Sequence, residues 1–299
     1  MPIILPEGLP ARHALEAEGV RAHRPDAAAP IRIVLFNLMP RKTDTEIQIA
    51  RLLAGTPYTV ELTLAIPDNY VSHTAPASHI GTFYKRWGAI RNASFDALIV
   101  TGAPIEHMPF EDVTYWPELT EVFDWAARKV HRSYYICWAA QAALYHFHGV
   151  PKHALPQKRF GVYRQTVLRP GHSLFDGLSG RFPVPVSRHT ETRSEDLPRG
   201  LAVLAASPQS GLCMVEERNR RTLYMFNHLE YGAETLAEEY RRDREAGTGI
   251  DLPKHYFPRN DPSRMPVNRW RPYARRIFRN WLRDIERERK ALHAASSAA

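Results

Sequence analysis

The sequence contains only two cysteines, Cys137 and Cys213, in 299 residues. Two cysteines cannot form the framework of several disulfides that stabilises small secreted proteins. No apolar run approaches the roughly 20 residues that a helix needs to span a bilayer, and the first residues lack the basic-then-apolar pattern of a signal peptide. We therefore predict a protein of the reducing cytoplasm that does not associate with a membrane.

Several binding signatures are also missing. The sequence has neither a Gly-x-Gly-x-x-Gly segment nor a P-loop, and it shows no helix-turn-helix pattern of the kind that reads DNA. The pair His146-Phe-His148 does not supply the convergent ligands that a metal site needs. These absences predict that the chain holds no metal and has no nucleic-acid partner.

Positive charge is in excess, with a net charge of +8 at pH 7. Such an excess suits a nucleic acid, a polyanionic small ligand such as a nucleotide or coenzyme A, or no partner at all. Much of the excess lies in residues 269–290, where apolar side chains recur every three or four positions. This spacing predicts an amphipathic helix that packs on the body and exposes a basic face. The apolar positions are Trp270, Tyr273, Ile277, Trp281 and Ile285.

Strand-like and helix-like segments alternate in the first half of the chain. Apolar runs typical of buried parallel strands occupy residues 31–38, 58–66, 95–102 and 134–137. Helical spacing occupies residues 45–53, 116–130 and 138–148. The alternation predicts an α/β protein, with a mostly parallel sheet covered by helices on both faces, as in flavodoxin-like folds. The polar stretch 67–92 is typical of a functional insertion.

The second half changes character. Shorter, partly antiparallel strands are predicted at residues 160–168, 183–187, 201–205, 211–217 and 222–226, followed by a helix at 234–246. We divide the chain into an N-terminal arm (residues 1–30), a single α/β domain (31–290) and a disordered tail (291–299) that is rich in Ala and Ser.

Three segments with reactive side chains follow predicted strands: residues 101–106, Cys137, and residues 227–230. Ligands of open α/β sheets bind beyond the carboxyl ends of the strands, so these segments are expected to meet. Cys137 falls between a strand and a helix, which suits a nucleophile, although a buried and inert cysteine is the alternative. His228 is the candidate general base, and Glu230 is the candidate residue that orients its ring.

An acyl transfer also needs donors for the oxyanion of its tetrahedral intermediate. We predict the backbone amide of Trp138 as one donor and an amide of the 103–106 loop, that of Ile105, as the other. Cys213 is expected to be a dispensable strand residue.

In its order of strand, cysteine, helix and then His-x-Glu, the chain resembles the class I glutamine amidotransferase-like fold. It resembles more closely the homoserine O-acyltransferases of the homoserine transsuccinylase family, from about residue 30 to 260. The segments that carry this resemblance are Phe36-Asn-Leu-Met-Pro-Arg-Lys42-Thr, Thr101-Gly-Ala-Pro, Cys137-Trp-Ala-Ala-Gln141, Gln157-Lys158-Arg-Phe-Gly, Ser187-Arg-His-Thr, His228-Leu-Glu230-Tyr and Arg242-Asp.

The resemblance implies roles for individual residues. Cys137 matches the family's acyl-thioester nucleophile, His228 its proton acceptor and Glu230 the third member of the set. Positions that match substrate-binding residues, or in the case of Lys42 a lysine near the site, are Lys42, Lys158, Ser187 and Arg242. The planar guanidinium of Arg242 suits a substrate carboxylate, although without the resemblance the sequence favours a solvated helix residue at this position.

The chain departs from these patterns in two places. Leu229 stands where the family usually has proline. Tyr135 and Ala139 replace the glycines that flank the amidotransferase cysteine, which argues against glutamine hydrolysis.

The resemblance also implies an activity. An acyl group would pass from acyl-CoA through a Cys137 thioester to the hydroxyl of L-homoserine, a step of methionine biosynthesis, in a homodimer without a metal or a tightly bound cofactor. In the family, glycine at the position of Glu106 goes with succinyl-CoA and glutamate with acetyl-CoA, so acetyl-CoA is the expected co-substrate. The alternatives are succinyl-CoA as donor, serine as acceptor, or a non-catalytic regulatory protein with the same fold.

Overall fold

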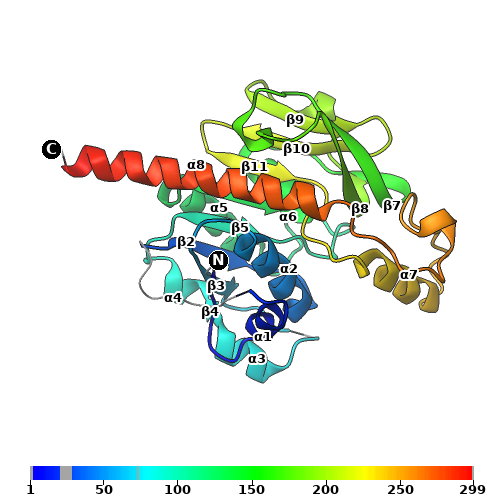
Figure 1. Ribbon diagram of the computed structural model, residues 1–299, viewed down its shortest axis with the longest axis horizontal. Helices are drawn as coiled ribbons and strands as arrows, with labels where there is room; N and C mark the ends of the chain where they lie inside the picture. The colour runs from blue at the N-terminus through cyan, green and yellow to red at the C-terminus, as the bar shows by residue number, and fades with distance from the viewer. Residues whose placement is uncertain (1–2, 21–28, 73, 298–299) are drawn as a thin grey trace.

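The computed structural model describes residues 3–20, 29–72 and 74–297. Its strands form one sheet in the order β1-β3-β2-β5-β6-β11-β10-β9-β7-β8, with β4 paired to β3 (Figure 1). The strands are β1 (Ile3–Ile4), β2 (Ile31–Phe36), β3 (Val60–Ile66), β4 (Tyr84–Arg86), β5 (Ala97–Val100), β6 (Arg132–Ile136), β7 (His153–Val167), β8 (Arg181–Glu191), β9 (Leu201–Ser207), β10 (Gly211–Glu217) and β11 (Thr222–Met225).

The helices lie between and after these strands. They are α1 (Pro10–Ala17), α2 (Lys42–Ala54), α3 (Ala77–Phe83), α4 (Trp87–Ile90), α5 (Trp116–Lys129), α6 (Trp138–His148), α7 (Thr235–Glu245) and α8 (Arg271–Ser297), with short 3₁₀ turns η1 (Ser173–Phe175), η2 (Ser194–Asp196) and η3 (Pro258–Asn260). The predicted α/β class is confirmed, because β1, β3, β2, β5, β6 and β11 are parallel and carry helices on both faces.

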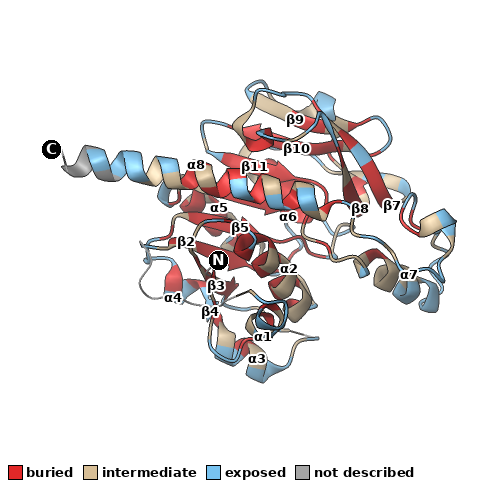
Figure 2. Ribbon diagram, viewed as in Figure 1, coloured by how far each residue is buried: buried red, intermediate tan, exposed pale blue. Residues whose placement is uncertain are grey.

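Two separate apolar cores lie on the two faces of the sheet. One core packs α1, α2 and α8 against the strands, and the other packs α4, α5 and α6 against the opposite face. In Figure 2 the buried positions follow the strands and the inner sides of these helices. Both faces are covered because β2, β5 and β6 are apolar in nearly every position, so neither face tolerates water.

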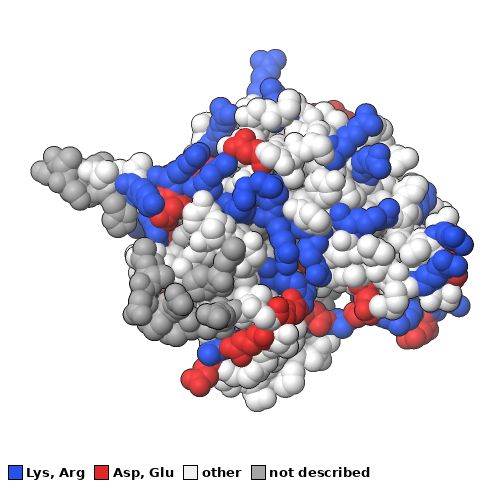
Figure 3. All heavy atoms as spheres, viewed as in Figure 1, with Lys and Arg blue, Asp and Glu red and all other residues white. Residues whose placement is uncertain are grey.

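The C-terminal amphipathic helix is present as predicted and forms α8. Ile277, Trp281 and Ile285 are fully buried against the sheet, and the exposed side carries basic residues that form a band across this face of the molecule (Figure 3). The amide of Asn280 donates to the carbonyls of Leu174 and Asp176, which ties α8 to η1. The helix runs to Ser297, so it includes residues 291–297 of the segment expected to be a disordered tail.

The described residues of the predicted arm and of the stretch 67–92 contain more regular secondary structure than the sequence pattern indicates. Ile3 and Ile4 add a short parallel strand to β3, and Leu9 and Leu15 are fully buried. The polar stretch 67–92 contains α3, β4 and α4. The described part of the arm therefore shares the core of the α/β domain.

The second half of the sheet is antiparallel from β11 to β8. The strand predicted at 160–168 is longer than expected, because β7 begins at His153 and pairs along β8 and at its end with β9. Gly161 in β7 also forms a parallel bridge with Lys254. This bridge brings the loop before residue 257 alongside β7, where it forms one wall of the groove described below.

Gly161 gives a test of this bridge. It has φ of +142°, and a Cβ there would lie 2.3 Å from the carbonyl oxygen of Lys254. We expect Gly161→Ala to cost on the order of 2 kcal/mol in the free energy of unfolding, because backbone strain and a backbone clash both act. A thermal melt should show a fall of several degrees. Gly180→Ala is the control, since a Cβ there meets no atom within 4 Å. Equal melting temperatures for the two variants would contradict this account.

Candidate active site

Cys137 lies on a sharp turn between β6 and α6. Its backbone adopts φ of 52° and ψ of −115°, and it is the N-cap of α6. Residues other than glycine rarely adopt this backbone conformation. At Cys137 it is held by a hydrogen bond of 2.6 Å from the Cys137 amide to the carbonyl of Met225. The turn places the thiol at the carboxyl end of the strand and beside the first amides of the helix.

His228 and Glu230 reach the same edge from the neighbouring strand. β11 pairs in parallel with β6, and Met225 is opposite Ile136, so the residues that follow the two strands emerge side by side. The Nδ1 atom of His228 lies 2.6 Å from Oε1 of Glu230; His228 is buried, and the Glu230 side chain is 8% exposed. Because Glu230 occupies Nδ1, the ring nitrogen left for proton transfer is Nε2.

The electrostatics of His228 favour its charged form. Burial by itself lowers the pKa of His228, but the negative charges of Glu230 and Cys137 outweigh it and raise that pKa well above its ordinary value. The two flanking groups thus stabilise an imidazolium in a site from which water is largely excluded. Such an imidazolium is a ready proton donor and can balance the charge of a thiolate.

Tyr231 completes the support of this histidine. Its ring stacks on the imidazole with centroids 4.1 Å apart and an angle of 19° between the planes. The Tyr231 hydroxyl donates to Oε1 of Glu239 at 2.8 Å. The stack fixes the plane of the ring, and the hydroxyl connects it to α7.

The predicted substrate-binding residues on β7, β8 and α7 come together at two carboxylates. Lys158 donates to Asp243 at 2.8 Å and to Glu239 at 3.2 Å, and the Ser187 hydroxyl donates to Glu239. Arg242 donates to Asp243 at 2.6 Å. Sequence reasoning missed both carboxylates. The signal for them was their spacing, because residues four apart on α7 share one face.

Lys42 lies in a different cluster. Its Nζ donates to the carbonyl of Asn37 at 2.5 Å and sits 4.1 Å from the centroid of the Tyr70 ring. Burial lowers the pKa of Lys42 to about 7, and the nearby Glu46 opposes this shift. None of the hydrogen bonds of Lys42 among the described residues reaches the Cys137–His228–Glu230 set, and its substrate contact stays a prediction.

The two predicted oxyanion donors differ in whether their amides are free to donate. The Trp138 amide is at the first position of α6, where no carbonyl of the helix can accept from it. The Ile105 amide is already used, since it donates to the carbonyl of Ala103 at 2.9 Å in a tight turn. The better second candidate is the amide of Gly102, which has no hydrogen-bond partner among the described residues. A Cβ added to Gly102 would lie 3.2 Å from Cβ of Cys137.

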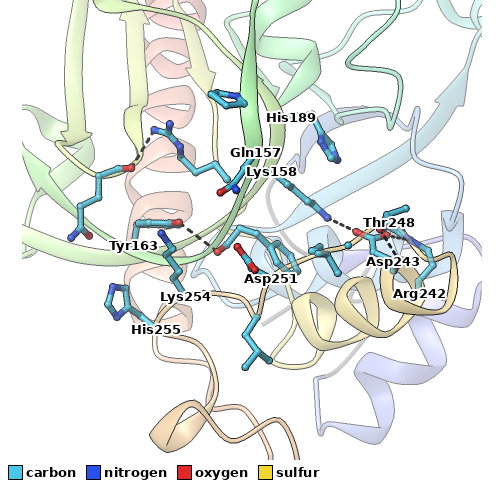
Figure 4. Close-up of a pocket in the computed structure, with 17 residues that line it drawn as sticks. Gln157, Lys158, Tyr163, His189, Arg242, Asp243, Thr248, Asp251, Lys254 and His255 are labelled. Carbon is cyan, nitrogen blue, oxygen red and sulfur yellow. Dashed lines mark hydrogen bonds and ion pairs between the residues drawn. The ribbon is translucent and has the colours of Figure 1, made fainter.

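Glu106 lies near His189, a residue that lines a large groove. Its charge acts on His189, whose pKa is lowered by burial and pushed upward by Glu106, and the His189 ring lies 5.0 Å from that of His107. His189 lines a groove of about 1100 Å³ together with Lys158, Arg242 and Asp243 (Figure 4). Glu106 is therefore close to the end of the groove at which the predicted substrate-binding residues lie.

The two other candidate histidines are separated. His146 contacts Asp124 at 2.9 Å, and His148 contacts Glu217 at 3.0 Å. Within residues 3–20, 29–72 and 74–297, no group of three or more His, Cys, Asp or Glu side chains has an arrangement that could hold a metal ion. In the same part of the chain, no helix has the length and apolarity needed to cross a bilayer.

This fold and site define a class: an α/β protein with a buried cysteine on a strand-to-helix turn and a His–Glu pair at the same edge of the sheet. Solved structures share the fold. A glutamine amidotransferase from Thermotoga maritima aligns with a TM-score of 0.57 and 13% identity, over 87% of this chain and 100% of that chain. A glutamine amidotransferase from Methylobacillus flagellatus aligns with a TM-score of 0.54 and 13% identity, over 86% of this chain and 96% of that one.

Sequence relatives narrow the class to a family. The family model described as homoserine O-succinyltransferase matches residues 2–289. A homoserine O-acetyltransferase from Rhizorhabdus wittichii is 50% identical over 96% of this chain and 92% of its own length. A homoserine O-acetyltransferase from Brucella canis is 48% identical over 95% of each chain. The chain belongs to the homoserine O-succinyltransferase family.

The charge balance around His228 gives a prediction. In Glu230→Gln, the largest contribution that raises the pKa of His228 is lost while burial still lowers it, so this pKa should fall. NMR titration of ring-labelled histidine measures the change, with the His228 signal assigned from its absence in His228→Gln. The exposed carboxylate of Glu234 supplies the control Glu234→Gln, which should leave the signal in place. An unchanged pKa in Glu230→Gln would show that Glu230 does not stabilise the imidazolium.

Proposed function

We propose that the protein is a homoserine O-acetyltransferase that works through a thioester on Cys137. The observation that carries the proposal is the Cys137–His228–Glu230 set, in which Cys137 and His228 are buried and the charges of Glu230 and Cys137 raise the pKa of His228. Glu106 acts on His189, which lines the groove that also holds Lys158 and Arg242. The relatives named homoserine O-acetyltransferase support it, because the match spans nearly the whole of both chains.

The first half of the proposed reaction loads the enzyme. The thiolate of Cys137 attacks the acetyl carbonyl of acetyl-CoA, and the amides of Trp138 and Gly102 hold the oxyanion that forms. The carbon–sulfur bond to CoA then breaks, and the imidazolium of His228 gives its proton to the departing CoA sulfur. This leaves an acetyl-thioester on Cys137 and a neutral imidazole, which is the form needed for the next step.

The second half transfers the acetyl group. Neutral His228 takes the proton of the homoserine hydroxyl while its oxygen attacks the thioester carbonyl. The tetrahedral intermediate collapses with loss of the Cys137 thiolate, and the product is O-acetyl-L-homoserine. His228 is then protonated again, and its charge faces the thiolate as at the start, so the cycle closes without an external acid or base.

The cluster at α7 suits the amino-acid acceptor. Homoserine carries an ammonium and a carboxylate group, and its recognition needs fixed charges of both signs. Glu239 and Asp243 supply carboxylates, while Lys158 and Arg242 supply cations that these carboxylates hold in place. Arg242 offers a planar fork that matches a carboxylate. Because Glu239 also binds Tyr231, the same helix connects the acceptor to His228.

Glu106 supports acetyl over succinyl as the transferred group. Succinyl ends in a carboxylate, which a glutamate beside the acyl pocket repels. Two such charges about 4 Å apart interact by about 4 kcal/mol at an effective dielectric near 20, before water and protonation reduce the effect. The second candidate is succinyl transfer, because the matching family model carries that description. A cytoplasmic location and a homodimer stay predictions, whichever acyl donor the enzyme uses.

A substrate panel tests the proposal. The purified protein is assayed with acetyl-CoA or succinyl-CoA as donor and with L-homoserine or L-serine as acceptor, and free CoA thiol and the acylated amino acid are measured together. We expect acetyl-CoA with homoserine to give the highest kcat/KM. Preference for succinyl-CoA would contradict the donor assignment, and preference for serine would contradict the acceptor assignment. If no pairing gave any transfer, the enzymatic function itself would be contradicted.

Glu106 can be tested separately. Glu106→Gly removes the charge and opens space, so kcat/KM for succinyl-CoA should rise relative to acetyl-CoA by on the order of tenfold or more. Glu111, which lies on the same long loop and is exposed, supplies the control Glu111→Gly. The ratio of the two donors should not change in this control. An unchanged ratio in Glu106→Gly would show that Glu106 does not select the donor.

A further inference from the structure

The groove is much larger than the proposed acceptor requires. Its volume of about 1100 Å³ is slightly above the roughly 300–1000 Å³ typical of small-molecule pockets, whereas homoserine has a four-carbon chain. One end holds Lys158, His189, Arg242 and Asp243, which belong to the site already described. The other end continues away from them between β7 and residues 248–255 (Figure 4).

This distal end carries basic and aromatic side chains. Arg159, Tyr163, Lys254 and His255 line it together with Gln209. Arg159 lies 3.6 Å from Glu191 and donates to the carbonyl of Gln209, so its charge is only loosely compensated. Lys254 forms no ion pair with any residue in the described part of the chain, and the single acidic side chain at this end of the lining is Asp251.

The backbone holds these side chains in place. The Lys254 amide donates to the carbonyl of Phe160 at 3.0 Å, and the Lys254 carbonyl accepts from Val162 at 2.8 Å. His255 follows with φ of 56°, and its carbonyl accepts from Arg269. Lys254 is thereby fixed beside β7, the strand that also presents Arg159 and Tyr163. A pair of cations on a rigid wall is suited to phosphate, and the aromatic rings are suited to a base.

We propose that this distal end of the groove binds the phosphorylated adenosine portion of the acyl-CoA donor, with Arg159 and Lys254 as its phosphate contacts. The assignment rests on the proposed use of a CoA donor. It gives the two ends of the groove separate tasks: recognition of the acceptor and acyl group at the α7 end, and recognition of the nucleotide at the other. The excess positive charge of the chain then has a specific use at this position.

Kinetics with three donors separate this role from a structural one. Acetyl-CoA, 3′-dephospho-acetyl-CoA and the phosphate-free S-acetyl-N-acetylcysteamine are compared in Arg159→Ala, Lys254→Ala and the wild-type protein. Each variant should raise KM for acetyl-CoA on the order of tenfold, since charge-assisted hydrogen bonds are lost. Neither variant should change kcat/KM for the phosphate-free donor. A KM for acetyl-CoA equal to that of wild type, or an equal loss with the phosphate-free donor, would overturn the assignment.

Matched variants control for charge and folding. Arg164 is exposed on the same strand β7 and does not line the groove, so Arg164→Ala should match the wild type with every donor. Lys254→Arg keeps the charge and should keep KM for acetyl-CoA within about threefold. Loss of affinity in Arg164→Ala equal to that in Arg159→Ala would point to a general charge effect and would contradict a specific site.

Direct binding tests the site without turnover. Calorimetry with adenosine 3′,5′-bisphosphate should show binding to the wild type and to Arg164→Ala, and a loss of about tenfold in Arg159→Ala and Lys254→Ala. If the wild type binds this nucleotide but transfers no acyl group, the proposed function fails and the groove assignment stands. Two results would overturn the groove assignment but leave the proposed function standing, provided that the enzyme uses acetyl-CoA. In the first, the wild type and both variants bind the nucleotide equally; in the second, none of the three proteins binds it.

Discussion

The parallel pairing of β6 with β11 is the constraint on which the site depends. These strands are about 90 residues apart in the sequence, yet the register that sets Ile136 opposite Met225 makes Cys137 and the 226–230 segment emerge at one edge. The hydrogen bond from the Cys137 amide to Met225 extends this pairing by one residue into the turn. A shift of the register by one residue would turn the side chains that follow it to the opposite face. The apolar residues on both sides of the sheet therefore also maintain the alignment of Cys137 with His228.

Burial strengthens the electrostatic interactions between the residues that are aligned in this way. In water a histidine and a carboxylate interact weakly, but the side chains of His228 and Glu230 are only 5% and 8% exposed, and the ring of Tyr231 stacks on the imidazole. Burial alone lowers the pKa of the imidazole, and the neighbouring negative charges reverse that effect. A similar balance of buried charges occurs at Lys158, Glu239 and Asp243. The site is thus a series of opposite charges that stabilise one another where solvent cannot, and they come from β7, from the segment after β11 and from α7.

The sequence was sufficient to predict the positions of the site residues that directly follow strands. Apolar runs before Cys137 and His228 predicted where strands end, and topology then required that these ends meet. The sequence was not sufficient where backbone hydrogen bonds or the direction of a helix decide which residues lie at the site. The use of the Ile105 amide within a turn, the separate cluster of Lys42 and the inward face of α7 with Glu239 and Asp243 depend on how loops return to the sheet. The long β7 and the ordered elements within residues 67–92 were missed because their stability comes from partners distant in the sequence.

The central claim is that Cys137 carries the acyl group. The most direct measurement is peptide mass spectrometry after the protein is mixed with acetyl-CoA in the absence of an acceptor. The account predicts one added acetyl group on the peptide that contains Cys137, none on the peptide that contains the buried Cys213, and loss of the label as soon as homoserine is added. Product formation without any acetylated cysteine, or undiminished turnover by Cys137→Ala, would contradict it.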